Sequence, residues 1–380
     1  MIEIQSPLVT GSRTLAVPLL GERGGGVGQA SALFWEAMLD TWSDDAVCIP
    51  LLPSPRPSGR TTPGIVDKLR FGTHLGTRQM FGLTRWILFS HLGLARTQRF
   101  VPTSRRVPYA IFLHGVEAWQ PMVPEDILLL QNATLRLANS EVTARRARAA
   151  NPGIGEVLVC PLGLSEGAEN TRPGAAPPIE QRRSVLVVGR MSQGERYKGH
   201  DELIDVWPDV VAAIPDAELV IAGDGDDRVR LESRAKASRA GDRIRFVGFV
   251  DRDGLAAQYA RAALFALPSR GEGFGLVYLE AMAHRLPCLG SPHDAAREVI
   301  EHGTTGLLAD PQDRLALGAA LIELLKDGEL RRRLGESGYQ RLLERFTFER
   351  FQRRLIDLLR ASFEVATKRE ASLQPSPRTP

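Results

Sequence analysis

The stretch Pro268-Ser-Arg-Gly-Glu-Gly-Phe-Gly-Leu-Val-Tyr-Leu-Glu280-Ala-Met-Ala joins two structural patterns within a few turns of chain. It follows the apolar run 262–267, which predicts a buried strand, and its second half, 276–283, predicts the first turns of a helix. A glycine-rich turn connects the two patterns. The helix N-terminus therefore lies just outside the carboxyl end of a strand, which is where open α/β sheets bind their ligands.

Two carboxylates, Glu272 and Glu280, bracket this turn. The unpaired N–H groups and the positive dipole end near Gly275 suit a phosphate or pyrophosphate. At about 1.5 Å of rise per helical residue, the two carboxylates would lie on the order of 10 Å apart. That spacing places one carboxylate at a sugar and the other at a ribose diol, so the segment predicts a sugar-nucleotide site. The alternative is a strand–turn–helix unit with two solvated glutamates.

The order of strand, Pro-Ser, Glu, Gly-Phe-Gly, Glu and Ala-Met-Ala resembles the signature of the retaining glycosyltransferases of family 4. The resemblance implies the GT-B fold, an α/β architecture in which two Rossmann-like domains with parallel sheets face a central cleft. It also implies a metal-independent hexosyltransferase without a cofactor. Such an enzyme moves a hexose from a UDP-, GDP- or ADP-sugar to a hydroxyl of a saccharide or lipid-linked acceptor, in surface polysaccharide or glycoconjugate biosynthesis.

Short apolar runs alternate with longer helical patterns along the chain, and this alternation predicts βαβ units and parallel sheets. The first half offers strands at 14–20, 46–52, 86–90, 109–114, 135–140 and 156–161. The second half offers strands at 184–189, 217–223, 243–250, 262–268, 287–291 and 305–309. Helices are predicted between them, among others over 29–39, 65–82, 315–326 and 329–346.

Three prolines and a glycine in 171–183 predict an interdomain linker over 169–183. We expect an N-terminal acceptor-side domain over 1–168 and a C-terminal domain that binds the sugar nucleotide over 184–346. By resemblance, the last helix, over 347–366, crosses back to the first domain. Three further prolines near the C-terminus predict a disordered tail over 370–380.

Composition indicates a soluble globular protein. The 380 residues carry a net charge of +3, with 43% hydrophobic and 24% charged residues, so no nucleic-acid footprint is expected. The N-terminus lacks a signal-peptide pattern, and no run approaches the ~18 apolar residues of a membrane span. Three widely spaced cysteines favour reduced thiols in a cytoplasmic protein. The seven histidines lack metal-ligand spacing, so no metal site is predicted.

A basic pair follows the predicted strand 184–189. Arg190 and Lys198 would clamp a pyrophosphate and stabilise it as it departs, although a solvated pair is the alternative. By resemblance they contact the donor diphosphate, while Glu272 binds hydroxyls of the donor sugar and Glu280 holds the ribose. The implied catalytic residues are Glu272, His114, Arg190 and Lys198. The implied donor-binding residues are Gly25, Gly26, Arg190, Lys198, Val250, Glu272, Phe274, Gly275, Leu276 and Glu280.

Two neighbouring segments of the second half fit the same family. Residues 245–250 resemble the strand and loop that hold the nucleobase, mainly through backbone groups. Residues 219–225 resemble the family's strand with its Gly-Asp-Gly turn. Asp224 and Asp226 also form an Asp-x-Asp pair, but a third oxygen donor is not implied, so we interpret them as turn residues rather than metal ligands.

The first half offers weaker candidates. The run of glycines over 24–28 resembles a loop beside the donor phosphates, although a flexible connector is the alternative. His114 follows a strand and is expected to contact the donor sugar, with structural packing as the alternative. Glu117 either binds the acceptor or caps the next helix. Residues 138–140 resemble a further signature of the first domain.

Residues 66–106 hold eight lysines and arginines against one acid, Asp67. One interpretation is a solvated helix face. The other is a basic surface that meets anionic lipid or a polyprenyl-diphosphate acceptor, which would place the protein peripherally at the inner face of the membrane.

One segment departs from the family. Related enzymes often carry Gly-Gly-x-x-Glu before Glu298, and this chain has no glycine pair there, which puts donor specificity in doubt. Two other functions stay open. A sugar-nucleotide 2-epimerase also has two Rossmann-like domains but lacks the pair of glutamates with seven residues between them. A non-catalytic sugar-nucleotide-binding protein would be free to lose the charged residues that this chain keeps.

Overall fold

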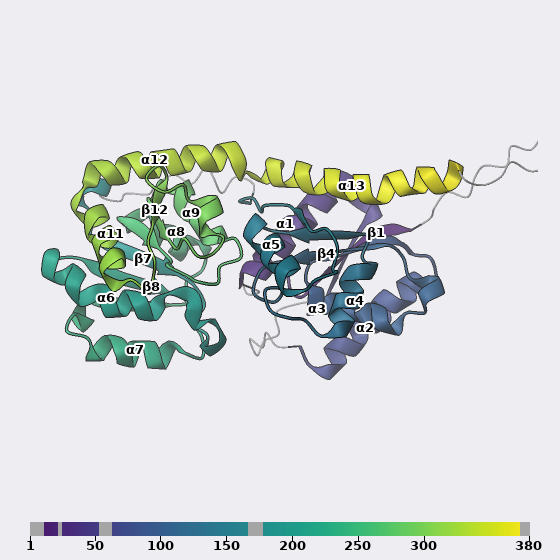
Figure 1. Cartoon of the computed structure of the whole chain (residues 1–380), viewed down its shortest axis with the longest axis horizontal. Helices are drawn as coiled ribbons and strands as arrows, with labels where there is room; N and C mark the ends of the chain where they lie inside the picture. Colours follow the sequence, from purple (N-terminus) through teal and green to yellow (C-terminus); the bar gives the residue numbers. More distant parts are fainter. Residues whose placement is uncertain (1–10, 22–24, 53–62, 166–177, 373–380) are drawn as a thin grey trace, which may run out of the picture. The chain divides into compact units, whose positions relative to one another are not determined.

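The computed structural model describes residues 11–21, 25–52, 63–165 and 178–372, with side chains up to residue 363 in the last helix. The chain divides into two compact units (Figure 1). Unit 1 comprises Met1–Pro161 and Glu349–Pro380, and unit 2 comprises Leu162–Phe348. Most of the predicted linker, 169–177, lies outside the described residues, as does 373–380 of the predicted tail.

Unit 1 is built on a six-stranded sheet in the order β2-β1-β3-β4-β5-β6, and every pairing is parallel. Its central strand β4 is buried at all five positions, as expected for a parallel sheet covered on both faces. The strands are β1 (Ser12–Val17), β2 (Ala46–Pro50), β3 (Thr84–Phe89), β4 (Tyr109–Leu113), β5 (Leu135–Ala138) and β6 (Leu158–Val159).

The last helix of the chain packs on unit 1, although it follows unit 2 in sequence. Phe351 lies 5.7 Å from Phe34, and Phe363 stacks at 4.9 Å on Trp86, both measured between ring centroids. The helices of this unit are α1 (Gly25–Trp42), α2 (Ile65–Met80), α3 (Leu92–Ala95), η3 (Arg96–Phe100), η4 (Thr103–Arg105), α4 (Pro124–Asn132), α5 (Glu141–Ala150) and α13 (Phe348–Ser372), with the short η2 (Ser43–Asp45).

Unit 2 contains a second six-stranded parallel sheet, in the order β12-β11-β10-β7-β8-β9. The first strand of the unit, β7, is central, so the chain winds outward from it in both directions. Such a doubly wound sheet places its ligand site where the strand order reverses. The strands are β7 (Ser184–Val188), β8 (Glu218–Ala222), β9 (Ile244–Gly248), β10 (Leu264–Ala266), β11 (Cys288–Gly290) and β12 (Gly306–Leu308).

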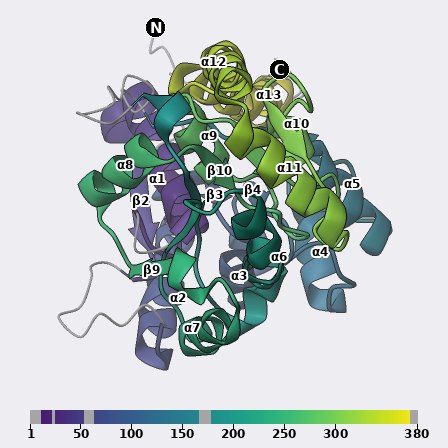
Figure 2. The same ribbon diagram turned by 90° about the vertical axis from the view of Figure 1, so that its left-hand side faces the viewer.

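Helices cover both faces of the second sheet. In Figure 1, α6 and α7 lie on one side of β7 and β8, and α8, α9 and α12 on the other; α6 and α11 pack side by side (Figure 2). The helices are η6 (Ile179–Gln181), η7 (Gln193–Lys198), α6 (His200–Ala213), α7 (Arg228–Ala237), η8 (Gly241–Arg243), α8 (Arg252–Arg261), α9 (Leu276–Ala283), α10 (Ala296–Val299), α11 (Arg314–Lys326) and α12 (Gly328–Arg345).

The predicted α/β class with parallel sheets is confirmed. Each predicted strand coincides with an observed one, although all observed strands except β3 are shorter than predicted because their ends bend into loops. One helix start is wrong in the prediction: α1 begins at Gly25 rather than at residue 29. The glycine run was expected to remain a turn, yet Gly25 and Gly26 form the first helical residues.

Candidate functional site

The carboxyl ends of β7, β8, β10 and β11 lie along one edge of the sheet in unit 2, because these strands are parallel neighbours. The loops that leave this edge carry the predicted charged residues of the unit. Arg190 and Lys198 follow β7, Glu272 follows β10, and Glu280 lies in α9. The structure therefore brings the predicted residues of the second half to one edge of one sheet.

A third charged residue, which the sequence analysis missed, holds the basic pair together. The guanidinium of Arg190 binds both carboxylate oxygens of Glu195, with 3.1 Å from Nε to Oε2. The ammonium of Lys198 lies 3.6 Å from the same Oε2. Burial opposes ionisation of Glu195, but the hydrogen bond from Arg190 and the charge of Lys198 outweigh it and hold the pKa of Glu195 below its ordinary value.

The three charges leave this cluster with an excess of one positive charge. The side chain of Arg190 is 64% exposed, so its guanidinium is accessible to a ligand from solvent. The side chain of Lys198 is only 19% exposed and is held beside Glu195. A dianionic or trianionic phosphate group fits such a partly desolvated cationic cluster, because charge-assisted hydrogen bonds to it are strong.

Glu272 lies in the same electrostatic neighbourhood. Burial raises the pKa of Glu272, the charge of Lys198 opposes this shift, and Glu195 adds to it. The main chain of Glu272 is fixed on both sides: its N–H donates to Asp294 Oδ2 at 2.8 Å, and its carbonyl accepts from the N–H of Ala295 at 3.1 Å. The carboxylate of Glu272 is thus carried by a loop with little freedom.

Helix α9 begins immediately after the glycine-rich turn. Its N-cap, Gly275, has φ +90°, and a Cβ there would lie 2.4 Å from the ring of Tyr278, so only glycine fits. Phe274 is buried and packs its ring edge-on at 5.8 Å against Phe346. The side chain of Phe274 is therefore part of the core, which leaves its backbone for the predicted donor contact. Leu276 is half-buried at the first helical position.

The second signature glutamate is oriented by a tyrosine. The hydroxyl of Tyr259 in α8 donates to Glu280 Oε2 at 2.9 Å. The ring of Tyr259 is buried and stacks at 5.2 Å on His284. Glu280 therefore projects from α9 in a fixed direction; its predicted role at the ribose is not tested by this contact.

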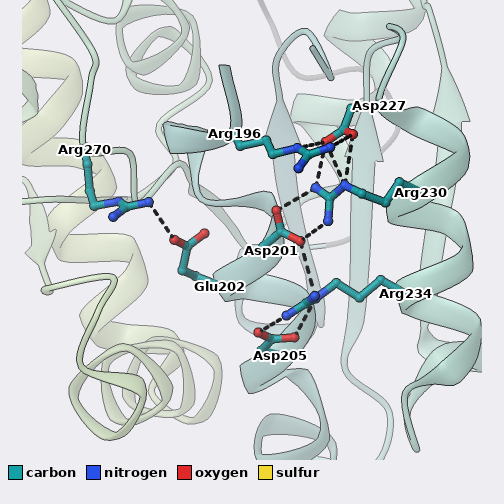
Figure 3. A network of polar contacts seen from close by, with 8 residues as sticks. All are labelled: Arg196, Asp201, Glu202, Asp205, Asp227, Arg230, Arg234 and Arg270. Atoms are coloured by element: carbon teal, nitrogen blue, oxygen red, sulfur yellow. Dashed lines mark hydrogen bonds and ion pairs between the residues drawn. The ribbon is translucent and has the colours of Figure 1, made fainter. Parts of the chain in front are cut away.

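A network of ion pairs supports the loop that carries the basic cluster (Figure 3). Arg196 of η7 forms a bidentate pair with the buried Asp227, at 2.9 and 2.7 Å. Arg230 of α7 binds the same carboxylate and also Asp201 of α6, at 2.7 Å to each oxygen of the latter. The hydrogen bonds from Arg230 and Arg196 hold the pKa of Asp227 well below its ordinary range. The segment between Arg190 and Lys198 is thereby anchored to two helices.

The same loop is interlocked with the glycine-rich turn. The N–H of Arg270 donates to the carbonyl of Tyr197 at 2.8 Å, and a Cβ on Gly271 would lie 2.5 Å from the Tyr197 ring. Gly199 has φ +83°, and a Cβ there would approach the carbonyl oxygen of Pro268 to 2.6 Å. Arg270 and Glu202 form a further ion pair at 3.5 Å across this boundary (Figure 3). The cations and Glu272 thus belong to one rigid frame.

The Asp-x-Asp pair serves the turn after β8. Asp226 Oδ1 accepts the N–H of Gln193 at 2.9 Å, and Asp224 Oδ1 accepts that of Gly225 at 2.8 Å. In the part of the chain that the structure describes, no group of three or more His, Cys, Asp or Glu residues is placed to hold a metal ion. Val250, predicted near the nucleobase, is half-buried at the loop after β9.

In unit 1, His114 lies at the carboxyl end of β4 and is held by neighbouring backbone. Its Nε2 donates to the carbonyl of Ser90 at 2.6 Å, and its own carbonyl accepts from Asn139 Nδ2 at 2.7 Å. Burial lowers the pKa of His114, although Glu117 opposes the shift, so the ring is neutral with its proton on Nε2. The structural packing that the sequence analysis kept as an alternative is therefore present.

Glu117 differs from the expectation of a helix cap. Its Oε1 accepts the N–H of His114 at 2.5 Å, so it closes the turn after β4 instead of capping α4, whose N-cap is Val123. Nearby, Ser140 caps α5 by accepting the N–H of Thr143 at 3.1 Å. The signature over 138–140 thus shapes this edge of the first sheet.

The glycine run at the start of α1 has one position where a side chain is excluded. A Cβ on Gly28 would lie 2.4 Å from the carbonyl oxygen of Gly21, whereas Gly25 and Gly26 have nothing within 4 Å. Gly25 has φ +61°. Gly28 is therefore required for packing, and Gly25 and Gly26 are the positions with open space for the predicted anion contact.

The basic region 66–106 is partly structural. Arg78 donates to Ser12 Oγ at 2.6 Å, Arg96 forms a bidentate pair with Asp126, and Arg106 donates to the carbonyl of Val101. The same region also exposes large apolar side chains, a feature that the charge count did not predict. They are Val66, Leu69, Met80, Phe81, Leu83 and Phe100, of which Phe100 is 88% exposed.

None of the helices in the described ranges is both long and apolar enough to cross a lipid bilayer.

Comparison with solved structures defines the class of fold. Sucrose-phosphate synthase from Thermosynechococcus elongatus superposes with a TM-score of 0.77 at 22% identity, covering 93% of this chain and 100% of that one. HepE of Anabaena, in complex with UDP and glucose, gives 0.73 at 18% identity over 91% and 98%. The fold is GT-B.

In the sequence comparison, residues 173–341 match the model of glycosyl transferases group 1. The phosphatidyl-myo-inositol mannosyltransferase of Mycobacterium leprae is 34% identical over 184 residues, which are 48% of each chain. N-acetyl-alpha-D-glucosaminyl L-malate synthase of Bacillus anthracis is 33% identical over 172 residues, 45% of this chain and 44% of that protein. The chain thus spans about half the length of these curated relatives. Residues 173–341, less than half of the chain, are therefore similar to the glycosyl transferases of group 1.

Proposed function

We propose that the chain is a metal-independent, retaining hexosyltransferase that moves a hexose from a nucleotide-diphospho-sugar to a hydroxyl acceptor. The observation that carries this proposal is the frame in unit 2 that joins Arg190, Lys198 and Glu272 beside the N-terminus of α9. A diphosphate needs the cations and the helix N-terminus, and a sugar attached to it needs a hydrogen-bond acceptor within reach.

In this proposal the residues have separate roles. Arg190 and Lys198 bind the diphosphate and stabilise the charge that develops as it leaves. The backbone N–H groups at Gly275 and Leu276 share that task. Glu272 accepts hydrogen bonds from hydroxyls of the donor sugar, and Glu280 accepts them from the ribose.

The transfer step conserves atoms and charge. The bond between the anomeric carbon and the diphosphate oxygen breaks, and the electron pair stays with that oxygen. The acceptor hydroxyl oxygen forms a bond to the same face of the anomeric carbon, and its proton passes to the departing phosphate oxygen. Attack on the same face gives retention of configuration, with Glu272 orienting the sugar rather than acting as nucleophile.

Donor and acceptor classes are proposed from the relatives. HepE was solved with UDP and glucose, and the Mycobacterium leprae relative is named as a mannosyltransferase of phosphatidyl-myo-inositol. We therefore propose a UDP- or GDP-hexose donor, with an ADP-sugar as the remaining option, and a saccharide or lipid-linked saccharide as acceptor. In unit 1, His114, Gly25 and Gly26 keep their predicted donor role and Glu117 its predicted acceptor role.

The proposal is tested by incubating the purified chain with UDP-, GDP- and ADP-hexoses and following thermal unfolding. A matching donor raises the melting temperature, because a ligand that binds only the folded state stabilises it. Product analysis with the stabilising donor and a panel of saccharide acceptors should then show an α-configured transfer product from an α-configured donor. If no sugar nucleotide stabilises the chain, or if the only product is an epimerised sugar nucleotide, the proposal is wrong.

We also propose that α2 and the neighbouring η3 contact an anionic membrane surface from the cytoplasmic side. Lys68 and Arg70 lie on α2 next to the exposed Leu69, Val66 is exposed on the same helix, and Phe100 is exposed in η3. Apolar side chains that insert at the interface and cations that meet the headgroups act together. The chain should co-sediment with vesicles containing phosphatidylglycerol more than with neutral vesicles, and Leu69→Glu should weaken the difference. Equal sedimentation with both vesicle types would refute this contact.

A further inference from the structure

Asp294 is a buried carboxylate beside the candidate site, and the proposed function gives this carboxylate no role. It lies in the loop between β11 and α10 and has no exposed surface. Its Oδ2 accepts the N–H of Glu272 at 2.8 Å, and its Oδ1 accepts the N–H of Ala296 at 3.0 Å. One carboxylate therefore ties the loop after β11 to the loop that carries Glu272.

A second bond in the reverse direction completes the contact. The N–H of Ala295 donates to the carbonyl of Glu272 at 3.1 Å, so the main chain of residue 272 is bonded on both sides by two consecutive residues. The hydroxyl of Ser269 also forms a hydrogen bond with Asp294, and Ser269 Oγ accepts the N–H of Gly271 at 3.1 Å. Asp294 is the centre of a clamp that fixes the direction in which Glu272 leaves the loop.

The sequence at this clamp departs from the resembled family. By the spacing to Glu298, Asp294 and Ala295 stand where related enzymes often carry a glycine pair. Glycine has no side chain that could accept the N–H of Glu272. Where the glycine pair is missing, this chain therefore has an additional contact, the hydrogen bond between Asp294 and the loop that carries Glu272.

A carboxylate is a costly group for a purely structural role at this place. Burial raises the pKa of Asp294 to about 7, and the charge of Glu272 acts in the same direction. An asparagine has a single acceptor oxygen, so it could accept only one of the N–H groups of Glu272 and Ala296. The carboxylate of Asp294 accepts both of them and so joins the two loops.

We propose that Asp294 is a positioning residue for the donor sugar: through its bond to the main chain of Glu272, it sets where the Glu272 carboxylate meets the sugar hydroxyls. This rests on the proposed function, because it deepens the role of Glu272. The diphosphate is held by the cations of the loop after β7, which Asp294 does not contact in any bond described. Loss of Asp294 should therefore weaken recognition of the sugar and leave recognition of the nucleoside diphosphate unchanged.

The test compares two probes, UDP and UDP-glucose, with GDP and GDP-mannose as the second pair. Binding constants are measured by calorimetry for the wild type, Glu272→Gln, Asp294→Asn and the double variant. Asp310→Asn is the matched control, since Asp310 is also a loop carboxylate that accepts a backbone N–H, from Gln312, and contacts His293 rather than Glu272. The quantity of interest is the ratio of the affinities for the sugar nucleotide and the free diphosphate.

Asp294→Asn should lower that ratio at least fivefold and leave the affinity for the free diphosphate within twofold. In the double variant the loss should equal that of Glu272→Gln alone, because both changes act through one side chain. Transfer assays should show a lower kcat with the sugar nucleotide, while Asp310→Asn behaves as the wild type. Equal losses for both probes, or losses that add in the double variant, would overturn the proposal.

A second variant keeps the proposal testable if Asp294→Asn folds poorly. Ala295→Pro removes the N–H that bonds the Glu272 carbonyl and leaves the carboxylate in place; the φ of −73° at Ala295 suits proline. Ala295→Pro should also lower the ratio of the affinities for the sugar nucleotide and the free diphosphate. An unchanged ratio would count against the proposal that this clamp positions Glu272. The failure of the proposed function looks different: the wild type then binds neither sugar nucleotide, or Glu272→Gln leaves the ratio unchanged.

Discussion

The carboxyl edges of the two sheets differ in the charge of the side chains that they carry. At the edge of the first sheet, His114 is neutral, and its polar atoms are bonded to the carbonyl of Ser90 and to the side chains of Asn139 and Glu117. At the edge of the second sheet, Arg190, Lys198 and Glu195 are held against one another. The same βαβ architecture thus carries a neutral, fixed histidine at the edge of one sheet and a charged edge with two cations in the other. The charged edge is the one that an anionic ligand would change.

The largest effect is expected for Lys198→Ala, because it removes a half-buried cation from the charged edge. Transfer should fall by about 100-fold or more in kcat, the range seen when a preorganised electrostatic group is lost. Steady-state assays at saturating donor measure this. Lys236→Ala on α7 is the matched control, and a comparable loss in that variant would show that the effect is not local to the edge.

Gly275→Ala should destabilise unit 2 by about 1–3 kcal/mol, since a left-handed backbone position and a clash with Tyr278 act together. Denaturant unfolding followed by circular dichroism measures the change. Gly194→Ala serves as control, because a Cβ at Gly194 meets nothing within 4 Å. If both variants unfold at the same denaturant concentration, the tight turn at the start of α9 is not as described.

The pH dependence of stability should differ between wild type and Asp294→Asn. The pKa of Asp294 is raised from 3.8 to about 7, with Glu272 and the hydroxyl of Tyr278 facing it. The folded state therefore binds the proton more tightly than the unfolded state, and the resulting stabilisation, complete below pH ~4, is lost as the pH rises through ~7. Melting temperatures between pH 4 and 8 should fall less steeply in the variant. Parallel curves would contradict the raised pKa of the buried Asp294.

The smallest effect is expected for Glu195→Gln. Removing this carboxylate leaves the positive charge of Arg190 and Lys198 uncompensated, so UDP or pyrophosphate should bind severalfold more tightly at low salt. Calorimetry at two salt concentrations measures the affinity and its screening. Weaker binding in the variant would mean that Glu195 serves mainly to orient the two cations rather than to oppose the ligand's charge.

The sequence predicted the parts of the molecule that depend on local patterns. Apolar runs located the strands of both sheets, and the glycines before Leu276 located the start of α9, because a glycine with positive φ ends the preceding turn. Glu195 was missed since its role appears only when η7 folds it between Arg190 and Lys198. Asp294 was missed because its partner is 22 residues away in the chain.

The predicted start of α1 was also wrong for a physical reason. A run of glycines predicts a turn by intrinsic preference, yet Gly28 is enclosed by the carbonyl of Gly21 and the chain turns helical from Gly25 onward. Tertiary packing overrode the local preference there. The charge count over 66–106 likewise identified a basic region but not which arginines, such as Arg78 and Arg96, are engaged in holding unit 1 together.

The most direct test of the central claim is the affinity of UDP-glucose and GDP-mannose for the wild type and for the double variant Arg190→Ala/Lys198→Ala, measured by calorimetry at one salt concentration. If the charged edge of unit 2 binds the donor diphosphate, the sugar nucleotide that binds the wild type should bind the double variant at least 100-fold more weakly. Both proteins should unfold at similar temperatures without ligand. Equal affinity in the wild type and the double variant would contradict the claim.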